Sequence, residues 1–104
     1  MIEEIRRLKE IISRLEYHFD KYLEYKFQSA NASRKPDKDR AHKSMISSAG
    51  YIESLLLEWP CYAIIKNGNQ FQFENFWRYV ESDMPDYLSV LKTHVEKLEI
   101  KDSQ

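Results

Sequence analysis

Glycine, proline and cysteine are all scarce in this sequence of 104 residues, which contains two, three and one of them respectively. An all-β sandwich or barrel needs many tight turns, and such turns depend on glycine and proline. The lone cysteine, Cys61, cannot form an internal disulfide or a cysteine-based zinc site. These shortages exclude a disulfide-stapled scaffold and argue against an all-β fold.

Long apolar runs are also missing. The longest are residues 55–57 and 61–65, which are far shorter than the ~20 residues of a membrane-spanning helix. The N-terminal residues 1–7 are charged and contain no apolar core of a signal peptide. We therefore expect a soluble, cytoplasmic protein that does not enter a membrane.

The sequence is rich in hydrophobic residues (42%), charged residues (32%) and aromatic residues, with seven Tyr, five Phe and two Trp. A chain of this length can bury about 60–70% of the surface that its unfolded form exposes. Aromatic side chains add large buried areas to such a core. We predict one helical domain over residues 1–104.

Residues 2–28 carry the strongest helical pattern. One apolar stripe follows steps of three and four residues: Ile5, Leu8, Ile12, Leu15, Phe19 and Tyr22. A second stripe, Ile11, His18 and Tyr25, repeats every seven residues beside it. Two adjoining stripes predict a helix that touches two neighbours.

Residues 29–39 are small, polar and charged, and predict an exposed loop. A second helix should follow, with Asp37 or Asp39 as its N-cap, and should end at or kink near Pro60. Residues 47–50, Ser-Ser-Ala-Gly, weaken its middle by about 1 kcal/mol at Gly50. A close helix contact or an overlying aromatic ring would compensate for that loss.

Residues 61–73 allow two interpretations. The Asn67-Gly68 pair favours a β-hairpin over residues 62–73, whereas Pro60 ahead of an apolar run favours a short helix ending near Gly68. We favour the helix followed by a loop, because an isolated hairpin is marginally stable.

The C-terminal third predicts a short amphipathic helix over 74–82 and a long helix that starts at Asp83, with Pro85 in its first turn. Residues 102–104 should form a frayed tail. The whole pattern predicts a mainly α protein, a small antiparallel bundle of three long helices and one or two short ones.

No motif for catalysis or for metal or cofactor binding is present. Cys61 lies in an apolar run, where a thiol behaves as a small hydrophobic group. His42 follows Asp39 by three residues, but a di-metal bundle needs a second such motif and two further glutamates. His18 most simply belongs to a helix seam. We predict no catalytic residue, no metal and no cofactor.

Two sets of residues are candidates for binding. Tyrosine is favoured at protein interfaces, and the second stripe with one further tyrosine forms the first set: Ile11, His18, Tyr25 and Tyr62. Alternatively, these side chains only line the bundle surface. Basic residues near a helix start, where phosphate is attracted, form the second set: Arg34, Lys35, Lys38, Arg40 and Lys43. Asp37 and Asp39 oppose their charge, so a solvated loop is the alternative.

From these patterns we expect a helical protein–protein interaction module, such as a subunit, adaptor, immunity or antitoxin-like partner, that self-associates. The alternative is a nucleic-acid-associated protein that binds phosphates through residues 34–43. We expect such binding to be weak and salt-sensitive, because two aspartates oppose the five basic residues of this segment.

Overall fold

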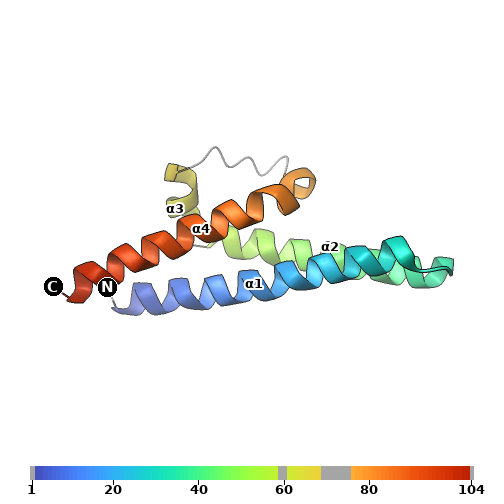
Figure 1. Cartoon of the computed structure of the whole chain (residues 1–104), viewed down its shortest axis with the longest axis horizontal. Coiled ribbons are helices and arrows are strands. Elements are labelled where there is room, and N and C mark those ends of the chain that lie inside the picture. Colours follow the sequence, from blue (N-terminus) through green and yellow to red (C-terminus); the bar gives the residue numbers. More distant parts are fainter. Residues whose placement is uncertain (1, 59–60, 69–75, 104) are drawn as a thin grey trace.

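Nearly all of the described residues lie in helices. A computed structural model describes residues 2–58, 61–68 and 76–103. In chain order these form α1 (Ile2–Asn31), α2 (Lys35–Leu57), α3 (Cys61–Gly68) and α4 (Phe76–Ser103), and no strand occurs in these ranges (Figure 1). The predicted mainly α bundle, with three long helices and a short one, is therefore confirmed.

Helix α1 is continuous over residues 2–28, where the sequence carries its strongest helical pattern. Its first apolar stripe forms the core of the bundle, with Leu8 and Leu15 fully buried and Phe19 packed against them. Glu3 and Glu4 lie in the first turn, where the helix dipole favours negative charge.

Helix α2 runs antiparallel to α1 and makes the largest helix–helix interface of the structure. It covers the second stripe of α1: Ile11 is fully buried, and His18 and Tyr25 are half-buried. Helix α4 packs on the neighbouring face of α1. The two apolar stripes of α1 thus pack against two helices of the same chain.

The loop predicted over residues 29–39 is much shorter, and this expectation was wrong. α1 extends to Asn31, whose side-chain amide donates to the carbonyl of Phe27 at 2.8 Å. Arg34 is the N-cap of α2 in place of Asp37 or Asp39, and its carbonyl accepts from the N–H of Lys38 at 3.0 Å. Pro36 suits this first turn because its fixed φ is helical and the missing N–H is not needed there.

The hairpin considered for residues 62–73 does not form, because Cys61–Gly68 is helix α3. Cys61 and Ile65, one turn apart, bury their side chains in the core. The loop expected after Gly68 begins outside the described residues. α3 packs mainly on α4, with a smaller contact to α2.

Helix α4 combines two segments that the sequence appeared to separate. Asp83 does not start a new helix, since the helix is continuous from Phe76 and contains Pro85 in its interior. A proline there removes a hydrogen bond and costs about 3 kcal/mol. Burial of Met84 and Tyr87 on either side of it offsets this cost. The predicted tail at 102–104 also needs correction, because α4 remains helical through Ser103.

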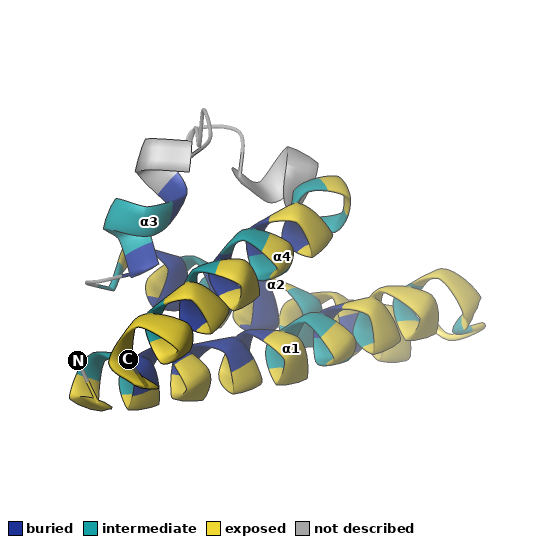
Figure 2. Ribbon diagram, turned by 60° about the vertical axis from the view of Figure 1, so that its left-hand side comes forward, coloured by how far each residue is buried: buried dark blue, intermediate teal, exposed yellow. Residues whose placement is uncertain are grey.

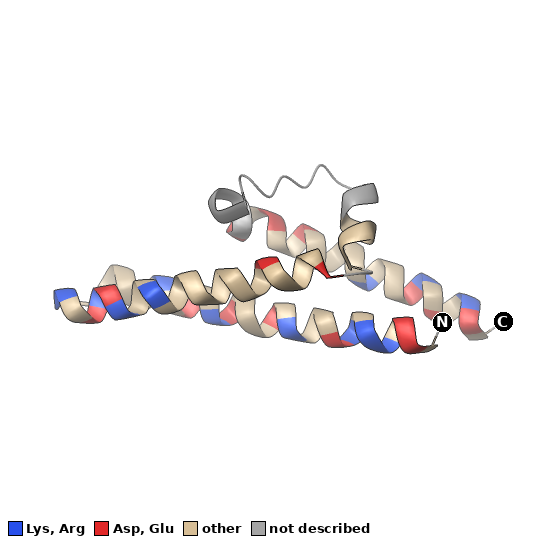
Figure 3. Ribbon diagram, turned by 180° about the vertical axis from the view of Figure 1, so that it is seen from behind, with Lys and Arg blue, Asp and Glu red and all other residues tan. Residues whose placement is uncertain are grey.

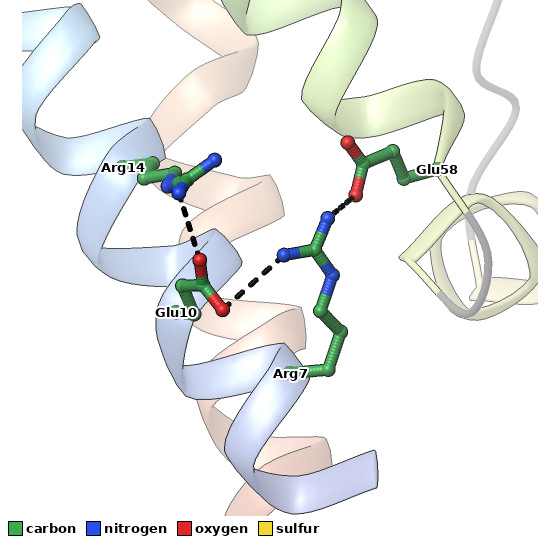
Figure 4. Close-up of polar contacts among 4 residues, drawn as sticks. All are labelled: Arg7, Glu10, Arg14 and Glu58. Carbon is green, nitrogen blue, oxygen red and sulfur yellow. Dashed lines mark hydrogen bonds and ion pairs between the residues drawn. The ribbon is translucent and has the colours of Figure 1, made fainter. Parts of the chain in front are cut away.

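Ion pairs link α1 to α2 and α4. Along α4, Lys9 meets Glu99 at 2.9 Å and Glu16 meets Lys92 at 3.4 Å, and Lys26 pairs with Glu81. Arg7 of α1 pairs with Glu58 at the end of α2 and contacts Glu10 at 3.2 Å (Figure 4). Half-exposed pairs of this kind contribute at most about 1 kcal/mol each to stability.

Residues 47–50 of α2, Ser-Ser-Ala-Gly, do not bring another helix close to the backbone at Gly50. A Cβ atom added to Gly50 would have no neighbour within 4 Å. Ser48 and Ala49 are buried, whereas Ser47 is exposed. Neither predicted compensation, a close helix contact or an overlying aromatic ring, therefore occurs at Gly50.

None of the described helices has the length and apolar character of a bilayer-spanning segment.

Candidate binding surfaces

The far end of the α1–α2 hairpin projects beyond the rest of the molecule. The structure measures 58 × 23 × 17 Å with a radius of gyration of 15.7 Å, compared with about 13 Å for a compact domain of 100 residues. We call residues 23–46 the distal arm. All of them are described, and Ala41 is the only buried one (Figures 1 and 2). The arm therefore has almost no core of its own.

Large apolar side chains are exposed on the distal arm. Leu23 and Phe27 of α1 are 40% and 69% exposed, and Ile46 of α2 is 46% exposed. Leu23 and Phe27 continue the i, i+4 row that begins at Phe19, whose side chain packs against the core. The apolar face of α1 therefore continues onto the arm, where it is uncovered.

A groove follows the seam between α1 and α2. It consists of two adjoining cavities, of about 310 Å³ and about 250 Å³, that share Tyr25 and Ser44. All of its lining residues belong to α1, α2 or the turn between them. We call it the seam groove, and its lining is as follows: Tyr17, His18, Lys21, Tyr25, Gln28, Ala32, Asp37, Arg40, Ala41, Lys43, Ser44, Ser47, Ser48 and Tyr51.

Three aromatic rings meet at the end of the seam groove that lies farthest from the hairpin turn. His18 stacks on Tyr51 of α2, with ring centroids 4.8 Å apart and an angle of 18° between the planes. Tyr17 meets His18 edge-on at 5.2 Å, and the Lys21 ammonium lies 5.8 Å from the Tyr17 ring centre. Burial, and secondly the charge of Arg14, lower the pKa of His18, so the stacked ring is neutral at neutral pH.

Basic side chains dominate the turn end of the hairpin. Lys and Arg positions, with Asp and Glu positions among them, occupy both helices near this turn (Figure 3). The five predicted cations Arg34, Lys35, Lys38, Arg40 and Lys43 are all exposed, and within the described part of the chain none of them forms an ion pair. Arg40 and Lys43 also line the seam groove. Asp37 is the one carboxylate in that lining.

The four predicted interface residues lie in three different places in the structure: the core, the seam groove and α3. Ile11 is part of the core, so its side chain is unavailable to a partner in this fold. His18 and Tyr25 line the seam groove. Tyr62 is half-buried on α3, and its N–H donates to the carbonyl of Glu58 at 2.9 Å.

The only cysteine of the sequence, Cys61, is buried in the core. Burial, and secondly the charge of Glu58, raise the pKa of the Cys61 thiol to about 12, which keeps the thiol protonated. No group of three or more metal-ligating side chains occurs in the ranges that the structure describes. A third cavity, between α1 and α4, holds Lys9, Glu16 and Lys92, and these are already engaged in ion pairs.

Sequence reasoning identified some of these surfaces and missed others. The basic residues and the off-stripe tyrosines could be found from the sequence, but the pairing of His18 with Tyr51 depends on how α1 and α2 are aligned. Leu23 and Phe27 were missed. Their signal was the i, i+4 row that extends from Phe19 past the end of the counted stripe.

The arrangement defines a mainly α protein with a projecting helical hairpin. No protein-family model, curated protein or solved structure matches the chain.

Proposed function

We propose that this protein is a helical interaction module that self-associates through its distal arm. The proposal rests on one observation: Leu23 and Phe27 form an exposed apolar row on an arm that has a single buried residue. Most helical stability in proteins comes from packing an apolar face against other elements. A partner on this row would supply packing that the described residues do not provide there.

A second copy of the chain suits this face. Two hairpins packed side by side form a four-helix bundle, and two-fold symmetry makes one patch complementary to itself. An antiparallel pair also keeps the basic turn of each arm away from the turn of the other, which reduces repulsion between like charges.

Sedimentation velocity over a range of protein concentrations tests the proposal. The wild type should form a dimer, and the double variant Leu23→Glu, Phe27→Glu should be a monomer because two charges would be buried in the interface. Ile100→Glu is the matched control, since Ile100 is 61% exposed near the end of α4. A wild type that stays monomeric at the highest concentration would refute self-association.

A second candidate function is supported by a different observation. Five exposed cations without ion pairs in the described structure surround the turn of the hairpin, and Lys or Arg contacts to phosphate drive weak, salt-dependent binding of nucleic acid. Substituting Arg34, Lys35, Arg40 and Lys43 with glutamine should abolish binding to a labelled oligonucleotide at low salt. If the wild type shows no binding at low salt, this candidate is excluded.

A further inference from the structure

We propose that the seam groove binds single-stranded nucleic acid, with a base stacked on Tyr51 and phosphates held by Lys43 and Arg40. This inference rests on the second candidate function and specifies its site and the form of its ligand. Its starting point is that the predicted cations and an exposed aromatic stack line one continuous groove.

The ring of Tyr51 can serve as a stacking platform. The ring is 59% exposed and is supported on one face by His18 at 4.8 Å, with a small angle between the planes. A side chain held by a stack loses less rotamer freedom when a ligand adds to it. Proteins that bind single strands use aromatic side chains in this way, because the bases of a single strand are free to leave their own stack.

The charge of the groove matches an anionic strand. The cavity beside Tyr51 is lined by Lys21 and Lys43, and none of its lining residues is acidic. Lys21 is paired with Glu24 at 3.3 Å, which leaves Lys43 as the cation available to a ligand. The adjoining cavity adds Arg40, with Asp37 as the opposing carboxylate.

The spacing along α2 suits a polymer better than a single small anion. At 1.5 Å per residue, Lys43 lies about 12 Å and Arg40 about 16.5 Å along the helix from Tyr51. The order is therefore ring, cation, cation, leading toward Lys38 and Lys35 at the turn. The serines between the ring and the cations, Ser44 and Ser47, provide hydroxyl groups that can donate to phosphate or sugar oxygens.

Duplex nucleic acid fits this groove less well. Its bases are stacked on one another and cannot reach Tyr51 without unpairing, which costs a few kcal/mol. We therefore expect single strands to bind more tightly than duplexes of the same sequence. An acidic protein segment is the competing ligand, because it would also use Lys43 and Arg40 but would not need a ring.

Fluorescence anisotropy of the full chain with a labelled single-stranded oligonucleotide of about 12 nucleotides, within the range of ~4–16 that a small single-strand site covers, tests the inference. Tyr51→Leu should weaken binding about tenfold or more, whereas Tyr51→Phe, which keeps the ring, should bind like the wild type. Lys43→Gln and Arg40→Gln should each reduce the salt slope by about 0.7. Lys101→Gln, on the exposed end of α4, is the matched charge control.

The outcomes distinguish phosphate binding by the cations from base stacking on Tyr51. If the cation variants weaken binding but Tyr51→Leu does not, or if duplex binds as tightly as single strand, then phosphate binding stands and the stacking site is refuted. If only poly-glutamate binds, the ligand is an acidic protein segment and both nucleic-acid ideas are wrong. Far-UV circular dichroism and thermal melts of each variant show whether a loss of binding reflects a loss of fold.

Discussion

Replacing Gly50 by alanine should stabilise the protein. Gly50 lies in the interior of α2, and a Cβ atom there would meet no other atom within 4 Å. Alanine is more favourable than glycine inside a helix by about 0.8–1.0 kcal/mol, because glycine has more backbone freedom to lose on folding. With no steric cost to subtract, we expect Gly50→Ala to raise the free energy of unfolding by about 1 kcal/mol.

Thermal and urea unfolding followed by circular dichroism measure this change. For a protein of this size, 1 kcal/mol corresponds to a rise in Tm of about 4–8 °C. The urea midpoint should increase while the slope stays constant, since the same surface is exposed on unfolding.

The reverse substitution at the adjacent position is the matched control. Ala49 is fully buried, so Ala49→Gly loses the same propensity and also the burial of a methyl group, about 0.8 kcal/mol. It should therefore destabilise by about 2 kcal/mol. If Gly50→Ala destabilised the protein instead, a neighbour would have to approach Gly50 more closely than the structure shows, and the reasoning would fail.

Three further predictions follow from single side chains. Leu91→Ala should lower the free energy of unfolding by about 2–5 kcal/mol in urea titrations, because Leu91 is fully buried; Ile100→Ala, exposed on the same helix, should change it by less than ~0.5 kcal/mol. Cys61, buried and with its pKa raised to about 12, should react with iodoacetamide at pH 8 only after denaturant is added, and rapid labelling of the native protein would contradict its burial. Burial first, and the charge of Arg14 second, lower the pKa of His18 below 6.5, so the unfolded chain takes up this proton first and stability should fall as the pH drops below about 6.5. His18→Asn should flatten that part of the stability–pH curve, and an unchanged curve would remove His18 as its cause.

Local sequence patterns predicted the long helices well, because each long helix hides a regular apolar stripe. Leu8 and Leu15 on α1, and Leu91 and Val95 on α4, follow the steps of three and four residues and are buried. The errors lie where tertiary contacts outweigh local preferences. Pro85 and Asp83 mark a helix start in isolation, but burial of Met84 and Tyr87 keeps α4 continuous through them.

The candidate binding surfaces were less accessible to sequence reasoning for a physical reason. The predicted cations lie at the turn whatever the alignment of the helices, so residue types alone identify them. The groove depends on which residues of α1 and α2 face each other, as when His18 meets Tyr51. That alignment depends on contacts distant in sequence, such as the core packing of α1 against α2, and no local pattern encodes it. For the same reason, the second stripe of α1 predicted two neighbours correctly without indicating that both belong to the same chain.

The beginning of α1 and the end of α4 lie together at the end of the molecule opposite the hairpin turn (Figure 1), and the Lys9–Glu99 ion pair holds them side by side. A peptide tag or surface linker attached to either terminus would consequently point away from residues 32–34. Immobilised molecules would display the turn toward solution in the same orientation whichever terminus is anchored. Agreement between the two immobilised formats would then show that neither attachment obstructs the binding site.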